Sequence, residues 1–174
     1  MRGDLALQLR IALRPRGLLG IAGAVAGMVG VVAVYLPWYE LGAKVTLLGH
    51  ARGRSIATLA GWQAQPWIWA AATISVFAAA IGVAVALDRP PPMTRRILLA
   101  LGLALGALAG LSALLVPASS RFLADPRFDQ LEAVAGRLPD DVALDLAVRP
   151  AIGLWITLTV AVLLLLVALA IREV

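Results

Sequence analysis

Four long apolar runs constrain this chain more than any other feature. They cover about residues 18–36, 67–87, 97–116 and 151–171, and none contains Asp, Glu, Lys, Arg or His. A helix rises about 1.5 Å per residue, so each run can cross a hydrocarbon core about 30 Å thick. Lipid offers the backbone no hydrogen-bond partners, so a spanning run must be helical. The sequence therefore predicts an all-α membrane protein, a four-transmembrane-helix bundle that forms a single domain over residues 1–174.

The composition agrees with a membrane protein and argues against a nucleic-acid-binding protein. The chain is 61% hydrophobic and 14% charged, whereas a soluble domain is about half apolar and a quarter charged. A net charge of +5 could indicate a nucleic-acid-binding protein, but the basic residues stand beside predicted spans, where Arg orients helices and meets anionic headgroups. We expect membrane lipids as partners and no nucleic acid. The Ala-, Leu-, Val- and Arg-rich usage suggests a bacterium with a GC-rich genome, hence its inner (plasma) membrane.

The distribution of basic residues predicts an orientation. With four spans, both chain ends share one side of the membrane. The N-terminal segment, the connection around residues 88–96 and the C-terminus hold eight of the 15 Arg and Lys residues in a small part of the chain. By the positive-inside rule the N and C termini are cytoplasmic, and residues 37–66 and 117–150 form outer loops. We expect the first span to be an uncleaved anchor, because no cleavage-site pattern follows it.

The first outer loop has the pattern of a β-hairpin. Apolar residues alternate with polar or small ones over 41–47, two glycines indicate a turn over 49–54, and residues 55–60 could return as a second strand. Four of the five Trp lie between positions 38 and 69, and Trp155 falls at the same predicted membrane level. Trp is enriched where a span leaves the lipid.

This loop is the predicted recognition surface. A basic hairpin tip held above the membrane could meet an acidic patch on a neighbouring subunit or an anionic headgroup. The alternative is a lid that only covers the outer end of the bundle. The residues expected to take part in recognition are Trp38, Lys44, His50, Arg52, Arg54, Trp62 and Trp67.

The second outer loop is expected to contain an amphipathic helix. Asp125-Pro126 resembles a helix start, and Phe128, Leu131, Val134 and Leu138 recur every three to four residues. Asp140-Asp141 could cap a further turn.

Glycine spacing predicts which spans pack closely. Gly23 and Gly27 form a GxxxG motif in the first span, and Gly102, Gly106 and Gly110 repeat that spacing in the third. Small residues four apart let another helix backbone approach. We expect spans one and three to pack through these glycines; the alternative is chance in glycine-rich helices.

The sequence contains few residues that could form a catalytic or metal site. There are no cysteines and one histidine, so a metal site is poorly supported and neither a cofactor nor a catalytic residue is expected. His50, between glycines and arginines, fits a solvated turn, and Asp140-Asp141 fits a cap better than an acid–base pair. Because no span contains an ionisable residue, an ion-coupled carrier is not expected. We expect a protein that is not an enzyme.

Pro37-Trp38-Tyr39 at the end of span one, a hairpin-like loop and two tightly joined spans resemble the actinobacterial tryptophan-associated four-helix transmembrane proteins. The resemblance is mostly one of topology, implies no catalytic residues, and leaves residues 61–67 unmatched. Two functions remain open. One is an accessory subunit that docks on a larger envelope complex with other integral membrane subunits. The other is a lipid- or hydrophobic-molecule-handling protein with a cavity between its spans.

Overall fold

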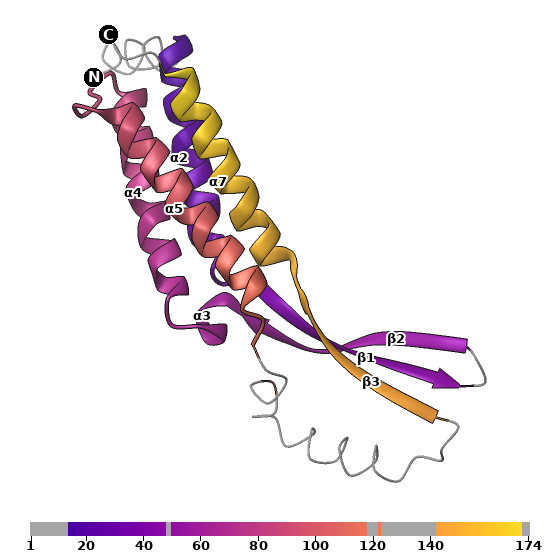
Figure 1. Cartoon of the computed structure of the whole chain (residues 1–174). Helices are drawn as coiled ribbons and strands as arrows, with labels where there is room; N and C mark the ends of the chain where they lie inside the picture. Colours follow the sequence, from indigo (N-terminus) through magenta and orange to yellow (C-terminus); the bar gives the residue numbers. More distant parts are fainter. Residues whose placement is uncertain (1–13, 48–49, 118–121, 123–141, 172–174) are drawn as a thin grey trace, which may run out of the picture.

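Four long helices form the body of the molecule (Figure 1). The computed structural model describes residues 14–47, 50–117, 122 and 142–171. The helices are α2 (Pro15–Ala33), α4 (Ile68–Ala86), α5 (Thr94–Leu114) and α7 (Ile152–Ala170), and a short helix, α3 (Gly61–Ala64), precedes α4. All four long helices have the length and composition to cross a membrane. The predicted four-helix bundle is confirmed.

Two helices begin earlier than the apolar runs do. α2 starts at Pro15, where a proline has no amide that the helix would need. α5 starts at Thr94, so Arg95 and Arg96 lie in its first turn and not in the connection before it. The arginines thus lie at the beginning of these two helices, before their apolar part.

The pairing of the spans differs from the prediction. α2 packs mainly along α4 and also contacts α7, whereas α5 packs mainly along α7. The first and third spans, α2 and α5, make no extended contact, so the predicted partner was wrong. The small residues against which the α2 backbone packs are on α4. They are Ser75, Ala79 and Gly82, which follow one another at helical spacing.

The glycines of α2 lie at this close contact. A Cβ added to Gly27 would sit 2.5 Å from the Ala79 nitrogen and 2.6 Å from the Ser75 carbonyl oxygen. A Cβ on Gly23 would be 3.7 Å from the Gly82 Cα, an ordinary contact. Gly27 is therefore the member of the predicted GxxxG pair that backbone approach requires.

The α5 glycines serve a different contact. A Cβ on Gly102 would be 3.0 Å from the Leu165 side chain of α7, so this glycine makes room for a large side chain. A Cβ on Gly106 would meet only the Ala161 Cβ at 3.7 Å, and one on Gly110 would meet nothing within 4 Å. The regular spacing of the three glycines therefore does not correspond to one continuous contact.

A three-stranded antiparallel sheet projects from one end of the bundle (Figure 1). Its strands are β1 (Pro37–Leu47), β2 (His50–Ala60) and β3 (Val142–Pro150), in the order β2-β1-β3. The predicted hairpin is confirmed as β1 and β2. The third strand comes from the long loop between α5 and α7, directly before α7.

The predicted turn over residues 49–54 was wrong. His50 pairs with Leu47, and the ladder continues through Arg52 opposite Val45 and Arg54 opposite Ala43. Gly53 lies within the strand opposite Lys44 and has no positive φ. Backbone pairing thus extends β2 through the two glycine-flanked arginines, and the basic residues are spread along a strand.

Some predictions lie outside the described residues. The amphipathic helix expected over Phe128–Leu138 and the capping role of Asp140-Asp141 belong to this group.

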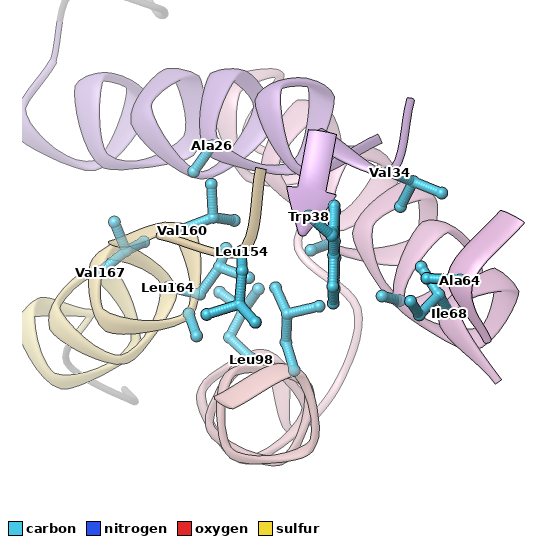
Figure 2. Close-up of a cluster of buried hydrophobic side chains, with 14 of the residues drawn as sticks. Ala26, Val34, Trp38, Ala64, Ile68, Leu98, Leu154, Val160, Leu164 and Val167 are labelled. Carbon is cyan, nitrogen blue, oxygen red and sulfur yellow. The ribbon is translucent and has the colours of Figure 1, made fainter. Parts of the chain in front are cut away.

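Buried apolar residues continue from the bundle into the base of the sheet. Figure 2 shows Trp38 as a member of this cluster, together with side chains such as Ala26, Ile68, Leu98 and Leu154 from the four long helices. Trp38, Tyr39 and Leu41 of β1 are each 0% exposed. The first part of β1 is therefore core, and only its later part is free of the bundle.

Candidate functional site

Trp38 joins the sheet to three helices. Its indole Nε1 donates a hydrogen bond to the Ala33 carbonyl oxygen at 2.8 Å. The Ala151 nitrogen, just before α7, donates to the Trp38 carbonyl oxygen at 2.8 Å. Cβ atoms on Gly61 and Gly153 would stand 2.7 Å and 2.6 Å from the indole ring. Both positions must therefore lack a side chain for the ring to fit.

Tyr39 ties β1 to the end of α5. Its hydroxyl donates to the Ser112 carbonyl oxygen at 2.6 Å, and the residue is fully buried. The last carbonyls of a helix have no partner within the helix. The tyrosine satisfies one of them. Burial raises the pKa of the Tyr39 hydroxyl above its ordinary value of 10.0, because the neutral form is favoured away from water.

Two further side chains meet the same helix end. Gln65 Nε2 donates to the Leu115 carbonyl oxygen at 2.7 Å, and Trp67 Nε1 lies 3.5 Å from the Ser112 hydroxyl oxygen. Within the described residues, Gln65 Oε1 is buried with no hydrogen-bond partner. These contacts join the segment between α3 and α4 to the end of α5, beside the Trp38 and Tyr39 bonds that hold the base of the sheet.

Beyond this base, one face of the sheet is hollowed. The hollow has a volume of about 370 Å³ and draws residues from all three strands. Its lining includes Glu40, Gly42, Lys44, Gly53, Arg54 and Arg149. We call this concavity the arm hollow, and the sheet beyond Leu41 the arm.

Two glycines leave the arm hollow open. A Cβ on Gly42 would be 3.8 Å from the Ala147 carbonyl oxygen, and one on Gly53 would be 3.8 Å from the Ala43 carbonyl oxygen. Both are ordinary contact distances, and neither glycine has a positive φ. Side chains would therefore fit, and packing does not explain why these positions carry none.

The arm hollow is basic. Lys44, Arg54 and Arg149 contribute three positive charges and Glu40 one negative charge, a net charge of +2. Lys44 and Arg54 are exposed, and Arg149 lies opposite Glu40 in the strand register. An acidic group of moderate size could enter this hollow and accept hydrogen bonds from the guanidinium and ammonium groups.

The structure separates the predicted recognition residues. Lys44 and Arg54 come together at the arm hollow, whereas His50 and Arg52 lie farther out along β2. Trp62 and Trp67 are exposed by 43% and 37% beside the base of the sheet. Trp38 is not on a recognition surface: it is 0% exposed because its ring fills the space between Gly61 and Gly153.

The exposed tryptophans form a belt at the end of the bundle that carries the sheet. Trp62 and Trp67 are joined there by Trp69 and Trp155, which lie in the first turns of α4 and α7. Trp69 also makes an edge-to-face contact with Tyr35 at a ring-centroid distance of 6.3 Å. Such a belt suits the level of lipid headgroups.

Arg149 and Gln65 are the site residues that sequence reasoning missed. Arg149 had a signal, because Val142, Leu144, Leu146 and Val148 alternate with small or polar residues in the pattern of a strand. Gln65 had none, since its partner is a backbone carbonyl 50 residues away.

No protein-family model, no curated protein and no solved structure matches this chain. The resemblance to tryptophan-associated four-helix proteins therefore stays a prediction. Among the described residues, no three His, Cys, Asp or Glu side chains are grouped so that they could hold a metal ion.

Proposed function

We propose that this multi-pass membrane protein is a non-enzymatic accessory subunit of a larger complex in the bacterial plasma membrane. In this proposal both chain ends are cytoplasmic, and the arm reaches outside to an integral membrane partner. The observation that carries the proposal is the arm itself. A lid would lie across the helix ends, whereas this sheet leads away from them (Figure 1).

The anchoring of the arm supports a docking role. Buried hydrogen bonds from Trp38 and Tyr39 hold the base of the arm in place. The arm therefore loses little orientational entropy when it binds a partner. Preorganisation of this kind raises affinity without additional contacts. The net charge of +2 at the arm hollow favours an acidic patch on the partner subunit.

A charge-reversal experiment tests this proposal. A photo-crosslinking residue at position 55, which is exposed and lines the arm hollow, would be introduced into the chain in its native membrane. We expect one discrete protein adduct. The double variant Lys44→Glu/Arg54→Glu should reduce that adduct at least about fivefold, since repulsion replaces attraction at two positions.

The matched control is Lys44→Arg/Arg54→Lys, which keeps both charges and should keep the adduct. Both double variants change exposed side chains and should insert and fold as the wild type does. The same adduct yield in the reversal variant, or adducts only with lipid in the wild type, would sink the docking proposal.

A specific observation favours a second candidate, the handling of a lipid or another hydrophobic molecule. A groove of about 610 Å³ runs between α2 and α7 on the outside of the bundle. Its lining is apolar apart from one threonine, and it includes Leu18, Val25, Ile156 and Leu163. A single acyl chain would suit such a groove.

Filling the groove distinguishes the two candidates. Ala22 is exposed and lines the groove, so Ala22→Phe should occupy it without disturbing the core. If lipid handling is the function, this variant should retain less lipid during purification in detergent. Unchanged retained lipid would remove this candidate and leave the docking proposal untouched.

A further inference from the structure

The end of the bundle opposite the sheet contains a basic cavity. It has a volume of about 530 Å³ and lies between the start of α2, the connection that follows α4 and the first turn of α5. Arg16, Arg95, Arg96 and Asp88 line it together with the apolar Val85 and Ile171. The volume is within the range of about 300–1,000 Å³ that small-molecule sites occupy. We call it the basic pocket.

Positive charge gathers at the basic pocket. Three arginines and one carboxylate are among the described residues that line it, and Arg16 also interacts with other groups of the protein. Arg95 and Arg96 are in the first turn of α5, which contains no acidic residue and no side-chain cap. The amino end of a helix already carries a partial positive charge, so the positive charges of these arginines are unfavourable at this position. An anion in the pocket would offset these charges.

Arg95 has unused hydrogen-bonding capacity. Its Nε atom is buried and has no hydrogen-bond partner among the described residues. A buried donor without a partner is unfavourable. The neighbouring Thr94 hydroxyl donates to the Pro91 carbonyl oxygen at 2.6 Å, and no side chain caps the helix. The described protein groups thus supply no acceptor to this Nε atom. The residue as a whole is only half-buried and lines the pocket, so its guanidinium group can meet an acceptor supplied from outside.

The connection that frames the pocket is stiff. Asp88 and Met93 both have left-handed backbone conformations, with φ values of 57° and 60°, and they bracket Pro90, Pro91 and Pro92. Proline fixes φ, so this segment has few alternative conformations. The pocket is held in shape before a ligand arrives, which lowers the entropic cost of binding.

We propose that the basic pocket binds the phosphodiester headgroup of an anionic phospholipid. Arg95 and Arg96 would donate to the phosphate oxygens, a geometry that guanidinium groups favour, and the glycerol portion would lie against Val85 and Ile171. The pocket is partly apolar and stands where α4 ends and α5 begins, at the level of headgroups if both helices span the bilayer. An amphipathic ligand fits this lining better than a small free anion. The proposal does not depend on the docking role of the arm.

Lipid exchange into nanodiscs tests this assignment. The purified full chain would be placed in phosphatidylcholine nanodiscs that contain a dilute fluorescent phosphatidylglycerol, and binding would be measured by energy transfer from a dye attached to the protein at the pocket end of the bundle. Arg95→Gln/Arg96→Gln should weaken phosphatidylglycerol binding by about fivefold for each arginine, the typical effect of one basic residue near anionic lipid. If the double variant is unstable, the single variant Arg96→Gln replaces it in the test, because it changes only an exposed residue.

Arg89→Gln is the matched control. Arg89 is exposed in the same connection but does not line the pocket, so this variant should bind phosphatidylglycerol as the wild type does. An equal loss in Arg89→Gln, or no loss in the pocket variants, would overturn the site. A further arm adds inorganic phosphate: failure to displace the lipid at millimolar concentration supports a lipid ligand, and full displacement would show that the ligand is a free phosphate.

Discussion

Trp38 shows how one residue can satisfy several structural demands. A tryptophan after a membrane span normally suggests an interfacial anchor, with its ring in the headgroups. In this chain the indole is fully buried, bonds to the Ala33 carbonyl oxygen, and stands between Gly61 and Gly153. Gly61 and Gly153 are distant in sequence from Trp38, so no local pattern could reveal that they make room for its ring. What was predictable is that Trp62 and Trp67 are exposed near the span ends.

A prediction at this scale concerns Tyr39. Tyr39→Phe removes the hydrogen bond to the Ser112 carbonyl oxygen and should lower the free energy of unfolding by about 1 kcal/mol. Thermal unfolding in detergent, followed by tryptophan fluorescence, measures the loss at neutral pH.

The same variant tests the pKa of Tyr39. The pKa is raised in the folded state above its ordinary value of 10.0, so the stabilisation is fully present below about pH 10 and is lost as the pH rises through the folded-state pKa. The stability difference between wild type and Tyr39→Phe should therefore shrink above pH 10. A difference that stays constant up to pH 11.5 would contradict this account of the tyrosine.

At the scale of elements, the four spans were readable because hydropathy alone defines them. The pairing of the spans was not readable, since it depends on which small residues face one another. The GxxxGxxxG spacing of α5 led us to predict that α5 packs against α2. In the structure, Ser75, Ala79 and Gly82 of α4 form the surface that contacts α2. The strand β3 was predictable from its alternation, yet the helical period farther upstream in that loop led to a different interpretation.

Two valine substitutions test the pairing. Gly27→Val would place side-chain atoms against the α4 backbone, where even a Cβ is within 2.6 Å of the Ser75 carbonyl oxygen. We expect it to lower the free energy of unfolding by about 3 kcal/mol, the upper end of the usual cost of overpacking. Steric trapping or thermal unfolding in bicelles would measure it.

Gly110→Val is the matched change in open space, because nothing lies within 4 Å of its added Cβ. It should leave stability unchanged or raise it slightly, since position 110 is only half-buried and valine suits a helix interior better than glycine does. Equal destabilisation by both variants would mean that the helices do not pair as described.

At the scale of the whole molecule, the two ends of the bundle are chemically different. One carries the sheet, the arm hollow and the exposed tryptophans; the other carries the basic pocket and most of the arginines near the spans. The sequence predicted this polarity because basic residues and tryptophans are unevenly placed along it. It predicted the hairpin of β1 and β2 but not the pairing of β3 with β1, because these two strands come from different loops that meet only in the folded protein.

The central claim is that the arm and the basic pocket stand on opposite faces of a membrane, the arm outside. Because the chain contains no cysteine, single cysteines can report this directly. Ser55→Cys in β2 and Pro92→Cys in the connection between α4 and α5 both replace exposed residues. Cells that make each variant would be treated with a membrane-impermeant maleimide before and after permeabilisation. The account predicts that Ser55→Cys reacts in intact cells and that Pro92→Cys reacts only after permeabilisation; equal reactivity of both in intact cells, or the reverse pattern, would contradict it.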